Sequence, residues 1–160
     1  LREQARALAL ADDELQPFEL ALLMALERHL PTTATPKRTG LGRAALADRT
    51  QPAAVVLSAI AWSGAGGDEQ LARTAHRRGA MALGFGDALP LLPRPNSTGR
   101  SLETAIGQLA DVSPLGKRNL VLACAETAAA DGTLSPDEVD LVRALGELWG
   151  CPVPLLATPA

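Results

Sequence analysis

The sequence contains no tyrosine, and aromatic residues make up only 2% of its 160 residues. Proteins that recognise nucleic acid usually offer aromatic rings for base stacking together with a basic surface. This chain has a formal net charge of −3, so nucleic-acid binding is not expected. With 47% apolar residues and so few aromatics, the core must be built from Leu, Ala, Val and Ile. That composition favours closely packed helices over strands.

Cysteines and long apolar runs are also scarce. Cys124 and Cys151 are the only two cysteines, too few for a disulfide scaffold and not at the spacing of metal ligands. We interpret them as small core residues, with a single bridge as the alternative. No apolar run approaches the roughly 20 residues of a membrane-spanning helix. The chain also lacks an initiator methionine and a signal peptide, and we expect a soluble piece of a longer protein.

One short motif occurs twice at a constant offset of 119 residues. Residues 11–19 read ADDELQPFE and residues 130–138 read ADGTLSPDE, with Ala, Asp, Leu, Pro and Glu at matching positions. In both copies one apolar helical run precedes the motif and another follows it. The repeat therefore predicts a helix–turn–helix unit used twice, each with an acidic elbow between its helices.

Hydrophobic periodicity predicts a compact all-α bundle of about seven or eight helices, with two pseudo-symmetric helix–turn–helix units in one domain over residues 1–160. No segment has the pattern of a strand. The predicted parts are a first repeat hairpin (1–30), middle helices (41–83), a linker (88–100) and a second repeat hairpin (101–156).

Within these parts, some finer expectations follow from the pattern. The proline-rich linker is expected to be an extended spacer. A short helix is expected over 41–48. A helix over 17–30 is expected to place five apolar residues on its core side, namely Phe18, Leu22, Leu23, Leu26 and Leu30. The helix over 68–83 carries small residues that would let a neighbouring helix approach closely, namely Ala72, Ala75, Gly79 and Ala82.

The second elbow has the stronger local signals. Ser135 and Glu138 have the spacing of a capping box, in which each side chain bonds the backbone N–H of the other residue. Gly132 can adopt the positive φ needed to leave the preceding helix. The first elbow has Asp13 and Gln16 in place of this glycine and serine, so its local signals are weaker.

The acidic residues of the elbows allow two interpretations. In the first, Asp131 and Glu138 cap and pin the hairpin. In the second, Asp12, Glu19, Asp131 and Glu138 converge across a pseudo-twofold axis and share a divalent cation. An ordinary EF-hand calcium site is not expected, because its third ligand position would be Ala129 and a calcium ion needs about six oxygens.

Other chemistry-bearing residues give weaker patterns. His29 and His76 are the only histidines, and neither has a partner at ligand spacing. A basic cluster, Arg73, Arg77 and Arg78, could contact an acidic partner or form a solvated helix end. Serine, threonine and cysteine residues lack a nucleophile motif with a nearby base. We therefore do not expect this chain to be an enzyme.

The pattern Ala-Asp-Gly-x-Leu-Ser-x-x-Glu at 130–138, between two apolar helices, resembles the TerB-like family of helical domains named for tellurite resistance. Three stretches also resemble the C-terminal soluble region of bacterial HtpX-type zinc membrane metallopeptidases. These stretches are residues 12–30, 89–93 and 117–156.

This resemblance implies a non-catalytic regulatory or protein-interaction module that requires no cofactor of its own. Its partners would be another protein or the other domains of a parent peptidase, and any zinc would belong to a catalytic domain absent from this chain. The module would lie on the cytoplasmic side, tethered to the inner membrane through the parent and not inserted itself. The alternative is a free-standing TerB-like stress-response domain that binds a divalent metal through its acidic residues.

Overall fold

The computed structural model describes residues 16–29, 44–97 and 99–151. Over these ranges it is all-helical, apart from one isolated β-bridge between Ala44 and Val112. The α-helices are α2 (Pro17–His29), α3 (Thr50–Ala65), α4 (Glu69–Ala82), α5 (Gly99–Leu109), α6 (Pro114–Ala128) and α7 (Pro136–Leu148). Four 3-10 turns lie at Leu46–Arg49, Gly86–Ala88, Arg94–Ser97 and Ala129–Asp131. The all-α prediction is thus confirmed for the described residues.

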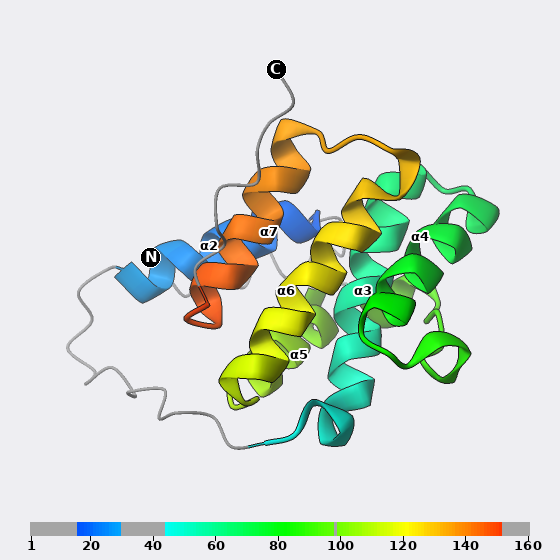
Figure 1. Cartoon of the computed structure of the whole chain (residues 1–160). Coiled ribbons are helices and arrows are strands. Elements are labelled where there is room, and N and C mark those ends of the chain that lie inside the picture. Colours follow the sequence, from blue (N-terminus) through cyan, green and yellow to red (C-terminus); the bar gives the residue numbers. More distant parts are fainter. Residues whose placement is uncertain (1–15, 30–43, 98, 152–160) are drawn as a thin grey trace.

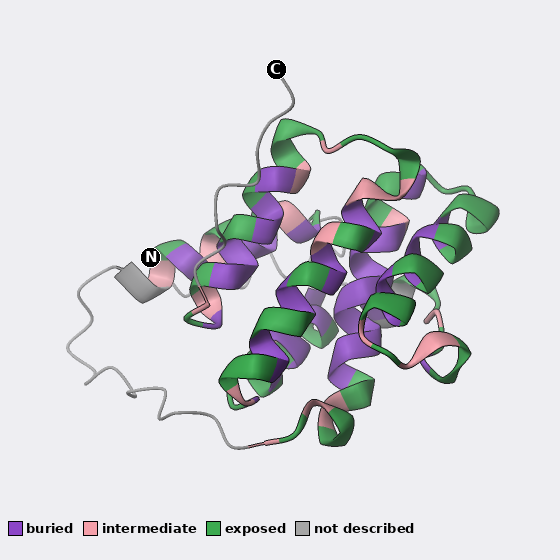
Figure 2. Cartoon of the chain, in the orientation of Figure 1, coloured by how far each residue is buried: buried purple, intermediate pink, exposed green. Residues whose placement is uncertain are grey.

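Helix α3 forms the centre of the bundle (Figure 1). Its residues 52–61 are all buried, and it packs against α4, α5 and α6. Figure 2 shows this burial as a nearly continuous band along α3, whereas the surrounding helices are buried only on their inner faces. Helices α2 and α7 pack against each other on one side of the bundle, and α4 lies on the other side.

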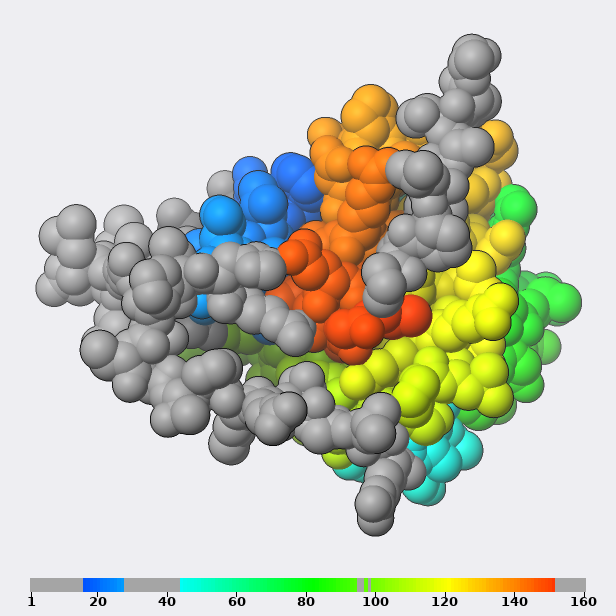
Figure 3. Space-filling view, turned by 60° about the vertical axis from the view of Figure 1, so that its left-hand side comes forward, coloured from blue at the N-terminus to red at the C-terminus, as the bar shows by residue number. Residues whose placement is uncertain are grey.

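Helices α4 and α6 approach each other closely because α4 presents small residues. Ala72, Ala75 and Gly79 are buried, as the sequence predicted, while Ala82 is exposed and that part of the prediction is wrong. Figure 3 shows α6 on the surface between α7 and part of α4. Cys124 on α6 is fully buried, and burial raises the pKa of its thiol to about 12. Cys124 and Cys151 do not form a disulfide.

The predicted count of seven or eight helices is not confirmed. The described ranges contain six α-helices, and the helical pattern over residues 1–11 lies outside them. The expected helix over 41–48 is wrong for its described part. Ala44 instead bridges Val112, with the Ala44 N–H bonded to Asp111 O at 3.1 Å, and only a 3-10 turn follows.

The inward face of α2 differs in part from its prediction, although Phe18 packs against the core as expected. Leu22 and Leu26 are 43% and 54% exposed, whereas Leu20 and Ala21 are almost completely buried. The reason is that α2 packs mainly against one helix, α7. A single neighbouring helix buries a narrower stripe of α2 than the spacing of its apolar residues predicts.

The proline-rich segment is packed against α3 and is not the extended spacer expected from its prolines. The Leu92 N–H donates to the buried Ser58 Oγ at 2.9 Å, and Trp62 Nε1–H donates to Leu92 O at 2.9 Å. Leu89 is 3% exposed. The other tryptophan, Trp149, donates from Nε1 to Ile106 O at 3.0 Å and holds the end of α7 against α5.

Candidate functional site at the elbow between α6 and α7

The second elbow has the predicted local geometry. Helix α6 tightens into the 3-10 turn Ala129–Asp131, and Gly132 follows with φ of 93°. The Glu138 N–H donates to Ser135 Oγ at 3.3 Å, and the Ser135 N–H donates to Glu138 Oε2 at 2.8 Å. The Thr133 N–H donates to Asp131 Oδ1 at 2.9 Å. The capping interpretation of Asp131 and Glu138 is therefore confirmed.

Capping uses only one oxygen of each carboxylate. Asp131 Oδ2 and Glu138 Oε1 have no hydrogen-bond partner within the described ranges. A Cβ placed on Gly64 would lie 3.5 Å from Glu138 Oε1, so this oxygen faces the end of α3. Each carboxylate thus keeps one oxygen available to a ligand.

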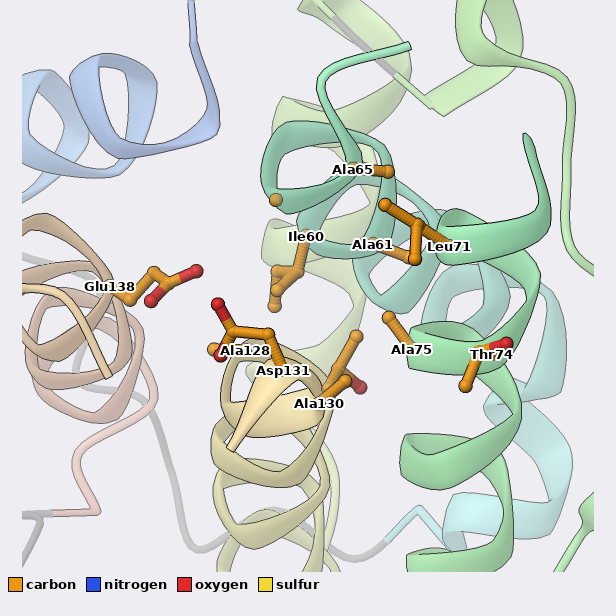
Figure 4. Close-up of a pocket in the computed structure, with 12 residues that line it drawn as sticks. Ile60, Ala61, Ala65, Leu71, Thr74, Ala75, Ala128, Ala130, Asp131 and Glu138 are labelled. Carbon is orange, nitrogen blue, oxygen red and sulfur yellow. The ribbon is translucent and has the colours of Figure 1, made fainter. Parts of the chain in front are cut away.

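Both carboxylates line a pocket with a cavity volume of about 80 Å³ between the elbow, α3 and α4. Figure 4 shows the Asp131 and Glu138 side chains extending toward the space in front of α3. The rest of the lining is mostly apolar and includes Ile60, Ala61, Ala65, Leu71, Ala75, Ala128 and Ala130. Leu71 on α4 is 58% exposed, so the pocket has an accessible apolar wall beside an acidic one.

The end of α3 adds to the negative character of this pocket. Gly64 and Ala65 belong to the last turn of α3 and line the pocket, and Ala61 lines it from the preceding turn. The C-terminal end of a helix carries a partial negative charge, because its last carbonyls lack partners within the helix. Together with the two carboxylates, this arrangement favours a cationic ligand group.

The first elbow shares one capping bond with the second. Helices α2 and α7 both have 13 residues, and their bounds differ by 119 at each end (17 to 136 and 29 to 148). The Gln16 N–H donates to Glu19 Oε2 at 3.2 Å, as Ser135 does to Glu138. Ser63 Oγ donates to Gln16 Oε1 at 3.4 Å, so the last residues of α3 meet the start of both repeat helices.

The four predicted carboxylates are only partly brought together. Asp131 and Glu138 share the pocket, whereas Glu19 is exposed and does not line it. Asp12 lies outside the described residues. Over the ranges that are described, no group of three or more His, Cys, Asp and Glu side chains forms a metal-binding cluster.

Sequence reasoning missed the contributions of α3 and α4 to this pocket. Gly64 and Leu71 both line it, and neither is among the candidate site residues named from the sequence. The run Gly64-Ala65-Gly66-Gly67 was the available signal, because an end of α3 without bulky side chains leaves room beside the elbow.

The basic cluster on α4 is paired within the chain. Arg73 contacts Glu69, Arg77 contacts Asp87 at 3.6 Å, and Arg78 contacts Glu126 at 2.8 Å. These side chains are all about half or more exposed, as expected for a solvated helix surface. His29 lies in α2 and His76 is buried on α4.

No family model, curated protein or solved structure matches this chain. In the part of the chain that the structure describes, none of the helices combines the length and apolarity needed to cross a membrane.

Proposed function

We propose that this domain is a non-catalytic binding module that captures a basic side chain of a partner protein in the elbow pocket. The observation that carries the proposal is the pairing of two available carboxylate oxygens, on Asp131 and Glu138, with an apolar wall that includes exposed Leu71. A lysine or arginine suits both features, since its methylene stem packs on apolar surface while its charged head meets carboxylates.

The proposal extends to the parent protein through the resemblance of three segments to HtpX-type peptidases. In this account the chain is a regulatory domain of a membrane-bound zinc metallopeptidase, on the cytoplasmic side, and its partner is another protein or another domain of the parent. Zinc would be held by the HExxH helix of the catalytic domain, and neither histidine of this chain lies in such a motif. The two elbows would be pseudo-symmetric halves of one TerB-like domain.

Isosteric variants allow the pocket to be tested without disturbing the fold. Asp131→Asn keeps an oxygen for the Thr133 N–H, and Glu138→Gln keeps the capping box, in which glutamine also serves. The matched control is Asp137→Asn, because Asp137 is an exposed acid in the first turn of α7 that does not line the pocket.

The experiment is a selection of random displayed peptides on the wild-type domain, with the double variant Asp131→Asn/Glu138→Gln as the counter-selection. We expect the selected peptides to place a lysine or arginine beside an apolar residue, and to be retained by the Asp137→Asn control. Selected peptides that lack basic residues, or that bind the double variant equally well, would contradict the proposal.

A second candidate function is divalent-cation binding by a free-standing TerB-like domain. It is favoured by one observation, that Asp131 and Glu138 share a pocket and each has one oxygen without a partner in the described ranges. Two carboxylates suit an ion that keeps most of its water, as Mg²⁺ does, better than one that needs a full set of protein oxygens.

Calorimetric titration of Ca²⁺, Mg²⁺, Mn²⁺ and Zn²⁺ into the wild type and Asp131→Asn tests this candidate. Binding heat from at least one ion, lost in the variant, would support it. No heat from any ion would reject cation binding, and it would leave capture of a basic side chain in place.

A further inference from the structure

Most of the large apolar side chains that the described part of the chain leaves exposed lie on α4 and α6. Six such side chains are at least 43% exposed, and four of them belong to these two helices, namely Leu71, Met81, Leu115 and Leu122. Helices α4 and α6 pack side by side, and Figure 2 shows exposed stretches on both. Single exposed leucines are ordinary on a protein surface, whereas several on one face indicate a binding surface.

The outer sides of α4 and α6 form one continuous face because the two helices run antiparallel. Leu71, near the start of α4, lines the elbow pocket together with Ala130, beyond the end of α6. Farther along α4, Arg78 Nε–H donates to Glu126 Oε2 at 2.8 Å, and both side chains are 48% exposed. Residue numbers thus rise along α4 while they fall along α6. The face therefore begins at the elbow pocket and runs along both helices.

Met81 and Leu122 extend this face by one more turn. Met81 follows Arg78 by three residues and Leu122 precedes Glu126 by four, so both lie one turn beyond the ion pair in the same direction. Leu115 lies two turns farther along α6, on the same side as Leu122, because seven residues separate them. The exposed apolar side chains therefore follow the face from the elbow pocket to the beginning of α6.

The two ends of this face carry opposite charge. At the elbow end, Asp131 and Glu138 line the pocket, and each keeps one oxygen available. At the other end, Arg118 is exposed on α6, one turn before Leu122. Arg118 forms no ion pair or hydrogen bond within the described ranges. A partner that covers the whole face is therefore complementary when it is basic at one end and acidic at the other.

We propose that this face docks an amphipathic helix of a partner protein, whose basic side chain enters the elbow pocket and whose acidic side chain meets Arg118. The basic contact rests on the function proposed above for the elbow pocket. A helix fits because its apolar side chains recur every three or four residues and can cover a surface built on two helices. Helix α6 has 15 residues, which corresponds to about 22 Å at 1.5 Å per residue. The partner helix therefore has about four turns.

The probe is a library of random displayed peptides of about 16 residues, the length of four helical turns, selected on the wild-type domain. We expect the selected peptides to carry apolar residues at helical spacing, a lysine or arginine near one end and an aspartate or glutamate near the other. A proline at the centre of a selected peptide should weaken binding at least about tenfold, because proline breaks a helix. Selected peptides without this spacing, or tolerant of the proline, would overturn the proposal.

Two variants test the apolar part of the face far from the elbow. Leu122→Gln and Met81→Gln should each raise the Kd of a selected peptide about tenfold, and glutamine keeps a high helix propensity. The matched control Leu26→Gln removes a leucine of similar exposure from α2, 54% against 53% for Leu122, and should change nothing. Peptides that need Asp131 and Glu138 but bind both variants as tightly as the wild type would overturn the docking face. Capture of a basic side chain by the elbow pocket would then still stand.

A charge exchange tests the far end of the face. Arg118→Glu should weaken a selected peptide, whereas the same peptide with its acidic residue changed to lysine should bind Arg118→Glu more tightly than the wild type. Absence of this exchange would overturn the charge-matched helix. Sedimentation equilibrium tests the other occupant, a second copy of this chain. A wild-type dimer that Leu122→Gln dissociates would assign the face to that second copy and would also overturn the proposal.

Discussion

Gly79 on α4 lies directly against Thr127 on α6. A Cβ placed on Gly79 would come within 1.9 Å of Thr127 Oγ1 and 3.0 Å of Ala123 O. The Thr127 hydroxyl donates to that same carbonyl at 2.8 Å. Contact between α4 and α6 therefore depends on the absence of a side chain at position 79.

This relationship predicts that Gly79→Ala destabilises the domain. Overpacking a tight contact costs about 1–3 kcal/mol, against a gain of about 1 kcal/mol in helix propensity when alanine replaces glycine. We expect a net loss on the order of 1 kcal/mol in urea denaturation.

A double-mutant cycle isolates the cause. Thr127→Ala removes the clashing Oγ1, so the double variant should be more stable than the sum of the two single losses predicts. A Gly79→Ala variant with unchanged or raised stability would show that α4 and α6 do not pack this closely.

The capping box at Ser135 and Glu138 predicts a specific pattern of stabilities. Ser135→Ala and Glu138→Ala should each lower the free energy of unfolding by about 1 kcal/mol, whereas Glu138→Gln should have a smaller effect because the amide oxygen still accepts the Ser135 N–H. Chemical denaturation of the three variants measures this order. Equal losses for Glu138→Gln and Glu138→Ala would show that charge, not the capping bond, stabilises the elbow.

Docking of the proline-rich segment depends on Ser58. Ser58→Ala leaves the Leu92 N–H without its acceptor, and an unsatisfied buried group costs about 1–3 kcal/mol. We expect faster amide exchange at Leu92 and in the adjoining residues, measured by hydrogen exchange. The control Ser101→Ala changes an exposed serine on α5 and should leave the exchange of this segment unaltered. Exchange at Leu92 that is fast already in the wild type would contradict the packing.

Because His76 is buried, the free energy of unfolding is expected to fall in mild acid. Burial lowers its pKa from 6.5 to about 4 in the folded state, so between these values the unfolded chain binds more protons and stability falls as pH falls. The loss is on the order of 1–3 kcal/mol, because solvent in the neighbouring pocket screens part of the burial effect, and it is complete only below about pH 4. Arg73, Arg77 and Asp87 line the same pocket as His76. Their contribution to the pH dependence of stability remains when His76 is replaced.

Urea denaturation of wild type and His76→Leu from pH 7 to pH 4 measures this effect. The variant should lose the steep part of the pH dependence and be at least as stable at pH 7, because it removes an unpaired buried nitrogen. His29→Gln serves as the control and should keep the slope. Parallel curves for wild type and His76→Leu would refute the assignment.

The elbow was predictable because its signals are local. Gly132 supplies the positive φ, and Ser135 and Glu138 are only three residues apart, so no knowledge of the fold was needed. The pocket beside it was not predictable, since Gly64 and Leu71 reach it from two other helices through tertiary packing.

The predictions that were wrong also have their cause in tertiary contacts. Ala44 belongs to a segment with helical periodicity, but its bridge to Val112 is a long-range contact that overrides local preference. The segment around Leu92 has prolines typical of a spacer, yet Ser58 and Trp62 provide its backbone with hydrogen-bond partners. In the sequence, His76 is a histidine without a second metal ligand at a suitable spacing. It lies four residues after Ala72 and three before Gly79, and all three are buried on α4.

The most direct test of the central claim is the affinity of one selected basic peptide for three forms of the domain, measured side by side by calorimetry. Capture of a basic side chain by Asp131 and Glu138 predicts that the Kd rises at least about tenfold in Asp131→Asn/Glu138→Gln and stays unchanged in Asp137→Asn. Equal affinities for the wild type and the double variant would contradict the elbow pocket as the binding site.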